Sequence, residues 1–169
     1  MYELLTLANG VRIVAEPMEA VRSTSVVIWV AAGSRCEKRE EGGSAHYIEH
    51  MLFKGTTSHT AAALAQEMDA FGGQCNAFTG RNSTCFYARS PDTHLQKSID
   101  ILSEMFFDSL FDEGDVAQER GVIMEEIGMY RDSPEDVVTE QLITGCFPGS
   151  LGRPVLGTAK TLRELTGEF

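Results

Sequence analysis

The chain has 169 residues, of which 43% are hydrophobic, an ordinary proportion for one globular domain with a real core. Its 14 lysines and arginines against 25 aspartates and glutamates give a formal net charge of −11, which disfavours a nucleic-acid backbone or an anionic membrane as a partner. A basic peptide or a metal cation suits this charge better.

Neither the cysteines nor the N-terminus indicates export. The four cysteines lie far apart and form no C-x-x-C pair, so we expect reduced, mostly buried thiols. The first residues lack a basic stretch followed by an apolar one, and the longest apolar run, residues 26–32, is too short to span a bilayer. We therefore expect a cytoplasmic protein that binds no membrane and no nucleic acid.

The chain begins with signals for strands. Short runs of Leu, Val and Ile flank Asn9-Gly10, a strong hairpin signal, so residues 3–17 should open the fold as a β-hairpin. Residues 23–34 are β-branched and continuously apolar up to Gly33, as a strand buried on both faces would be. We expect this segment to be a central strand.

Two helices and a second hairpin should follow. Ser44 is expected to cap a short helix that ends near Gly55. Residues 60–73 hold an N-cap threonine, strong helix formers and a Gly-Gly stop, which predicts a second helix. Short runs rich in Thr, Phe and Tyr on either side of residues 80–82 predict a hairpin, closed by Pro91.

The second half of the chain predicts helices. Apolar residues recur at spacings of three and four in residues 92–111, and residues 115–131 form another helical segment. Ser133 before Pro134 predicts the start of a further helix, and residues 159–169 predict one more after a loop rich in Pro and Gly. Together the elements predict an α+β fold with a mixed, largely antiparallel sheet and helices packed on one face.

The segment AHYIEHMLFKGT, from residue 45, contains the pattern H-x-x-E-H, formed by His46, Glu49 and His50. Residues i, i+3 and i+4 of a helix share one face, so the two imidazoles can reach one point while Glu49 lies beside them. Zinc is chelated in this way, and a catalytic zinc site uses three protein ligands. The pentapeptide lacks the third ligand, and a surface helix without metal could carry the same residues.

One predicted helix carries three glutamates, Glu119, Glu125 and Glu126. Glu126 shares a helical face with Glu119 and with Val122 and Ile123, so its surroundings should be partly apolar. A carboxylate in such surroundings is costly unless it is paired or bound to a metal. This helix is therefore a candidate source of the missing ligand.

Four segments, in this order and spacing, resemble the pitrilysin family of inverted zinc peptidases, which includes insulin-degrading enzyme and the mitochondrial processing peptidases. They are GSRCEKREEGGSAHYIEHMLFKGT from Gly33, FGGQCNAFTGRNSTCFYA from Phe71, ERGVIMEEI from Glu119 and GRPVLGT from Gly152. The resemblance covers nearly the whole chain. It implies zinc ligation by His46, His50 and Glu126. It also implies that Glu49 is the catalytic base and Glu119 an essential carboxylate beside the ligands.

The resemblance implies zinc-dependent (Zn²⁺) hydrolysis of peptides or presequence-like substrates, with Glu49 accepting the proton of the attacking water. It further implies that Asn76, Ala77 and Phe78 lie on a sheet edge that binds the substrate as an added strand. An ordinary hairpin strand with a core phenylalanine would show the same residue pattern. Phe53 is either a core residue or part of the pocket wall after the scissile bond.

Chains of this family are more than twice as long, with two similar halves, and the second half supplies an Arg and a Tyr near the scissile carbonyl. We therefore expect residues 1–169 to form an N-terminal zinc-peptidase domain without its C-terminal remainder and its second homologous half. The isolated chain should be weak or inactive without that half as a partner, and should self-associate through exposed edges and apolar surface.

Two alternatives remain at this point. A family member that has lost activity could serve as a binding or assembly subunit, and a zinc ion could be purely structural. The intact motif disfavours the first alternative. Glu49 disfavours the second, because a structural site has no use for a base.

Overall fold

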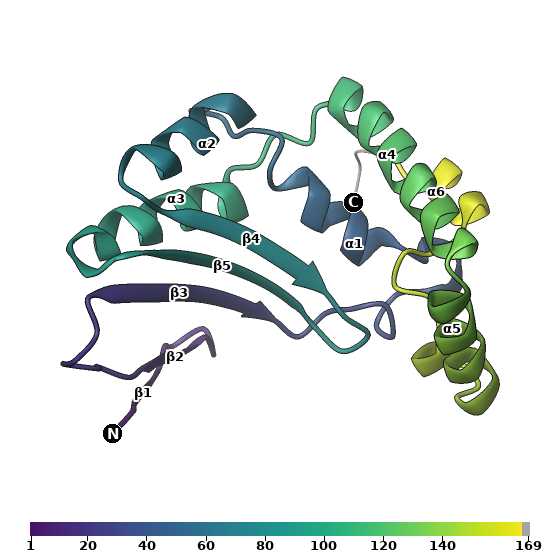
Figure 1. The fold of residues 1–169 in the computed structure, drawn as a ribbon, viewed down its shortest axis with the longest axis horizontal. Coiled ribbons are helices and arrows are strands. Elements are labelled where there is room, and N and C mark those ends of the chain that lie inside the picture. Colours follow the sequence, from purple (N-terminus) through teal and green to yellow (C-terminus); the bar gives the residue numbers. More distant parts are fainter. Residues whose placement is uncertain (167–169) are drawn as a thin grey trace.

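A computed structural model describes residues 1–166 of the chain. Figure 1 shows a curved sheet with helices over one face and a second group of helices beyond one end of the strands. The chain opens with the expected hairpin, formed by β1 (Glu3–Thr6) and β2 (Arg12–Ala15), which pair as a two-stranded sheet of their own. Gly10 turns the hairpin with a φ of 90°, a left-handed conformation that favours glycine.

The main sheet is antiparallel throughout and has the strand order β3-β5-β4, with β3 spanning Ser23–Val30, β4 Gln74–Thr79 and β5 Thr84–Pro91. The expectation that the first of these strands is central was wrong. Within residues 1–166, β3 lies at an edge, and its side chains alternate between exposed and half-buried. The second hairpin instead places β5 in the middle, where most of its side chains are buried.

Helices α2 (Ala61–Ala70) and α3 (Leu95–Phe107) cover the inner face of this sheet. Thr60 caps α2 as expected, because its hydroxyl accepts the Ala63 N–H at 3.2 Å. The helix expected over 92–111 is shorter at both ends. A 3₁₀ turn (Asp92–His94) takes the place of its expected first residues, and the helix ends at Phe107. The sheet and both helices share one hydrophobic core. Its buried members are Leu52, Leu64, Met68, Phe86, Ala88, Ile101, Leu102 and Met105.

Within the described residues, the chain forms four further α-helices: α1 (Ser44–Met51), α4 (Glu113–Asp132), α5 (Pro134–Cys146) and α6 (Ala159–Glu164). Ser133 caps α5 as expected, because its hydroxyl accepts the Asp136 N–H at 3.4 Å. The expected cap at Ser44 was wrong: Gly43 is the N-cap of α1, and Ser44 is the first helical residue. A second core joins α1, α4 and α6. Its buried members are Tyr47, Met51, Val116, Ile123, Ile127, Leu162 and Leu165.

Helix α1 packs between these two cores. Tyr47 and Met51 belong to the core with α4 and α6, whereas Ile48 and Leu52 pack into the core of the sheet. The Tyr47 hydroxyl also donates a hydrogen bond to the Val116 carbonyl of α4. The helix is thus held on two sides, and its histidines and Glu49 are left on the remaining polar face.

The cysteines are free, as expected, but they are not mostly buried. Cys85 is buried and Cys75 is half-buried, whereas Cys36 and Cys146 are exposed. Among residues 1–166, no helix combines the length and the apolar character that crossing a bilayer requires.

Truncation of Met51 tests the importance of the packing around α1. Met51 is 0% exposed, so Met51→Ala should lower the free energy of unfolding by about 2–5 kcal/mol, because it removes a buried side chain and leaves a cavity. Met129, 71% exposed on α4, provides the matched control, and Met129→Ala should change the stability by less than about 0.5 kcal/mol. Urea unfolding followed by circular dichroism measures both values. Equal effects of the two substitutions would contradict the packing described here.

Candidate metal centre

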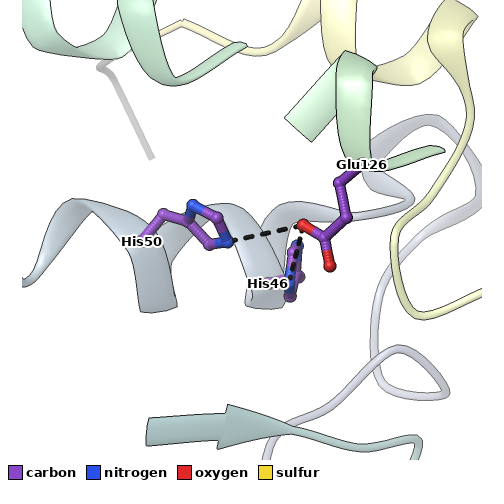
Figure 2. Close-up of side chains that lie close together, drawn as sticks. All are labelled: His46, His50 and Glu126. Atoms are coloured by element: carbon purple, nitrogen blue, oxygen red, sulfur yellow. Dashed lines mark ion pairs between the residues drawn. The ribbon is translucent and has the colours of Figure 1, made fainter. Parts of the chain in front are cut away.

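Three side chains from two helices converge on one point (Figure 2). The Oε2 atom of Glu126, on α4, lies 3.8 Å from Nε2 of His46 and 3.7 Å from Nε2 of His50, both on α1. One potential ligand atom from each of the three residues lies within 4.8 Å of the others. Because α1 and α4 share the second core, the packing of apolar side chains brings these polar groups together.

The donor set fits a zinc ion. Two ligand atoms of a tetrahedral zinc lie about 3.3 Å apart, given bond lengths of roughly 2.0–2.1 Å, and the separations of 3.8 and 3.7 Å found here exceed this by about half an ångström at most. His46 is 8% exposed, and its burial, followed by the neighbouring His50, lowers its pKa to about 4. The imidazole is therefore neutral at physiological pH, as a metal ligand must be.

Glu119 orients His50 from the side opposite to Glu126. The residue is 3% exposed, and its carboxylate lies 3.0 Å from Nδ1 of His50 and 2.6 Å from Nζ of Lys54. Burial opposes ionisation of Glu119, but the hydrogen bonds from Lys54 and His50 outweigh it and leave the pKa below its usual value. An ionised Glu119 only accepts hydrogen bonds, so Nδ1 of His50 carries the proton and Nε2 is left free to bind a metal.

Glu49 lies beside the three converging residues without joining them. Its Oε2 accepts a hydrogen bond from the Thr79 hydroxyl of β4 at 2.5 Å. Burial raises the pKa of Glu49, and the negative charge of Glu126 adds to the rise, while the Thr79 bond and His50 oppose it. A carboxyl group with a raised pKa, held next to a metal site but outside the ligand group, is suited to accept and return a proton.

A cavity of about 570 Å³ opens over these groups. His46, Glu49 and Glu126 line it together with Ala77 and Phe78 of β4. Thr79 and side chains of α5 and the loop before α6 complete its walls. Arg81 and Glu140 also line this cavity, and the Arg81 guanidinium lies 2.8 Å from the Glu140 carboxylate.

The outer edge of β4 borders this cavity. Within residues 1–166, β4 pairs with β5 alone, so its other edge is open. The Ala77 N–H donates a hydrogen bond to the side-chain oxygen of Asn76 at 2.8 Å. Phe53 and Asn76 line a second cavity, of about 510 Å³, near the start of β4. Ala77 and Phe78 thus line the same cavity as His46, Glu49 and Glu126, whereas Phe53 and Asn76 line the second cavity.

On α4, Glu126 points at the imidazoles and the neighbouring Glu125 is exposed. The apolar surroundings expected for Glu126 are only partly present, because Ile123 is buried but Val122 is 42% exposed. Sequence reasoning missed Lys54 and Thr79, which hold the two catalytic candidates Glu119 and Glu49. Lys54 stands four residues after His50, a spacing that could have drawn attention to it, whereas the contact of Thr79 arises only from tertiary packing.

Substitution of Lys54 tests the pairing of Glu119. In metal-free protein at pH 7, Lys54→Met should lower the free energy of unfolding by about 1–3 kcal/mol, because it leaves a buried carboxylate with one partner fewer. The lowered pKa of Glu119 stabilises the folded protein above the unfolded pKa of about 4.3, and this stabilisation is lost as the pH falls through the folded pKa. The two stability curves should therefore converge once the pH has fallen below the folded pKa of Glu119.

Lys97, which pairs with Glu67 in a more exposed position, provides the control for this experiment. Lys97→Met should cost at most about 1 kcal/mol. Urea unfolding across the pH range measures all three proteins. A Lys54→Met deficit that stays unchanged down to the lowest pH at which the protein is still folded would show that the lysine acts through packing and not through the charge of Glu119.

Known proteins resemble this chain in sequence and in fold. The family described as Insulinase (Peptidase family M16) matches residues 12–159. The uncharacterized zinc protease YmxG of Bacillus subtilis is 44% identical over 169 residues, which are 99% of this chain and 41% of the relative. The probable mitochondrial-processing peptidase subunit beta of Arabidopsis thaliana is 37% identical over 164 residues, 96% of this chain and 31% of the relative.

The structure of a protease from Helicobacter pylori superimposes with a TM-score of 0.92 at 26% identity, covering 98% of this chain and 40% of that one. The chain thus spans about two fifths of the length of this neighbour and of the Bacillus relative. The family match extends over most of the chain and includes all the residues that converge at the candidate metal centre. The chain belongs to the insulinase family of peptidases, M16, whose relatives include proteins named zinc proteases.

Proposed function

We propose that this chain is the N-terminal catalytic domain of a zinc-dependent endopeptidase. The observation that carries the proposal is the convergence of His46, His50 and Glu126 on one point, with Glu49 held beside them by Thr79. A purely structural zinc site would need no base at this position. The names of the relatives, zinc proteases and a processing peptidase, support the same class of activity.

In this proposal, His46, His50 and Glu126 hold zinc, which supplies a Lewis acid and lowers the pKa of a bound water towards about 7. Glu49 takes the proton of the attacking water and then passes it to the leaving amine. Glu119 keeps the His50 ring in the tautomer that binds through Nε2. Thr79 keeps the Glu49 carboxylate directed into the cavity.

The open edge of β4 is the proposed binding site for the substrate backbone. A peptide in extended conformation would add to this edge as a strand and run across the cavity, past Ala77 and Phe78. Phe53 and Asn76 would then meet its side chains at the other end of β4. The net charge of −11 favours a basic, presequence-like peptide.

Metal analysis of purified variants tests the ligand set. The wild-type protein should bind one zinc ion per chain, and the double variant His46→Ala, His50→Ala should bind none, because the remaining carboxylate cannot hold the ion alone. Glu126→Gln should weaken binding strongly, since the amide loses the negative charge of the ligand. Glu125→Gln, the same change at the neighbouring exposed position, is the control and should bind normally. Stoichiometric zinc in the double histidine variant would refute the assignment.

Substitution of Glu49 separates proton transfer from metal binding. Glu49→Gln should retain zinc and reduce kcat by a factor of at least about 10², because an amide can sit near the water but cannot take its proton. Hydrolysis of a fluorogenic basic peptide by the full-length protein measures the rate, and elemental analysis measures the zinc. Unchanged turnover at full zinc occupancy would remove Glu49 from the role of base.

We further propose that residues 1–169 act together with a C-terminal remainder and a second homologous half or subunit. The chain spans 41% of the Bacillus relative, which is consistent with such a division. Enclosure by a second half would exclude water and orient the peptide, and its Arg and Tyr would donate to the oxyanion.

The proposed division predicts that the isolated chain is a poor enzyme. At equal zinc occupancy, its kcat/KM for a fluorogenic peptide should lie at least about 10²-fold below that of the full-length protein, since one missing oxyanion donor typically costs 10² to 10³ in rate. Light scattering should also detect self-association of the isolated chain through its open strand edges. Comparable kcat/KM values in the two proteins would show that the other half is dispensable.

A further inference from the structure

Helix α1 begins without a capping side chain of its own. Its N-cap is Gly43, with φ 94° and ψ 0°, and the first helical hydrogen bond runs from the Tyr47 N–H to the Gly43 carbonyl at 2.9 Å. The N–H groups of the first turn have no helical carbonyl to bind, and in most helices a Ser, Thr, Asp or Asn at the N-cap satisfies one of them. Glycine cannot do so.

The close approach of a distant loop explains why glycine is required at this position. A Cβ atom on Gly43 would lie 2.8 Å from the carbonyl oxygen of Leu156, and one on Gly157 would lie 2.2 Å from the carbonyl oxygen of Gly42. The backbones of residues 42–43 and 156–157 therefore interlock, in a packing that leaves no room for a side chain. A cap for α1 must come from outside the helix.

Glu37 supplies this cap from six residues upstream. Its carboxylate accepts the N–H of Gly43 and the N–H of Ala45, each at 2.9 Å, and a hydrogen bond from the Ser44 hydroxyl at 3.4 Å. The residue is 9% exposed. One of its oxygens accepts from the Gly43 N–H, and the other accepts from the Ala45 N–H and the Ser44 hydroxyl. A carboxylate at this end of a helix is also favoured by the helix dipole.

Glu37 is itself fixed by the loop that interlocks with the helix. The Arg153 guanidinium donates a hydrogen bond to the backbone carbonyl of Glu37, and the carbonyl of Arg153 accepts one from the Ser34 hydroxyl at 3.3 Å. Arg153 stands just before the residues that pack on Gly43. The start of α1 is therefore held by Glu37 and by this loop. The two contacts are linked, because Arg153 of the loop also binds the backbone of Glu37.

We propose that Glu37 is a positioning residue for the metal centre, which holds the first turn of α1 so that His46 faces Glu126. His46 follows directly after Ala45, whose N–H Glu37 binds. Helix α1 has only eight residues, and a helix so short has little stability of its own. Fraying of one turn would displace His46 while Tyr47 and Met51 keep the rest of the helix packed. Loss of the Glu37 side chain should therefore weaken zinc binding by more than the reduced global stability of the protein would explain.

The proposal rests on the metal-binding role proposed above, and the experiment separates the two. In the full-length protein, the zinc dissociation constant is measured by competition with a chelator, and stability by urea unfolding of the metal-free protein. Glu37→Ala should raise the dissociation constant about 10- to 100-fold, the range typical of residues that support metal ligands. Glu37→Gln should have a smaller effect, because the amide oxygen still accepts one of the two N–H groups. Glu40→Gln, an exposed neighbour, is the matched control and should leave the constant unchanged.

Peptide hydrolysis gives a second measurement. At zinc concentrations that saturate each variant, Glu37→Gln should lower kcat and leave KM unchanged, because the edge of β4 does not depend on Glu37. If the alanine variant does not fold, the glutamine variant, which preserves shape and volume, decides the question. A folded Glu37 variant with wild-type zinc affinity and kcat would overturn the positioning role, even if its stability is reduced. Failure of the wild-type protein to bind zinc would instead overturn the proposed metal site.

Discussion

The packing of one short helix between two hydrophobic cores determines the rest of the candidate site. Eight residues form too few backbone hydrogen bonds to be stable alone, so the conformation of α1 depends on its contacts with the sheet and with α4. These contacts cover two sides of the helix. The remaining side carries His46, Glu49 and His50, and the same core that buries Tyr47 and Met51 also fixes the position of α4 and thereby of Glu126.

Two carboxylates beside this helix, the buried Glu119 and the half-buried Glu49, have different sets of partners. Glu119 is surrounded by donors and has a lowered pKa, whereas Glu49 has one hydroxyl donor and a raised pKa because its desolvation is less fully compensated. The two glutamates thus differ in what they can do: Glu119 keeps a negative charge that orients an imidazole, whereas Glu49 can exchange a proton. The difference comes from neighbours such as Lys54 and Thr79 and not from the glutamates themselves.

Much of this arrangement could be predicted from the sequence, because short-range patterns determine it. Helical spacing brings His46 and His50 together, and Thr60 and Ser133 begin their helices as their types predict. The order of the strands could not be read in the same way: an apolar run predicts a strand, but which strand lies in the middle depends on the pairing of the second hairpin. The cap of α1 was missed for a similar reason. Ser44 has the residue type of a cap, yet the loop from Arg153 to Gly157 forces a glycine at the preceding position and transfers capping to Glu37.

The open edge of β4 also bears on which proteins could serve as substrates. A strand edge binds backbone N–H and C=O groups, which every residue except proline offers in full, so it selects for conformation more than for residue type. A segment that is already paired in a helix or a sheet of its own protein cannot make these bonds until it detaches. Within the proposed function, the rate at which a folded protein is cut would then include the free energy of its local unfolding. Unstructured segments and leader peptides would be cleaved readily, whereas the same residues inside a stable domain would be protected.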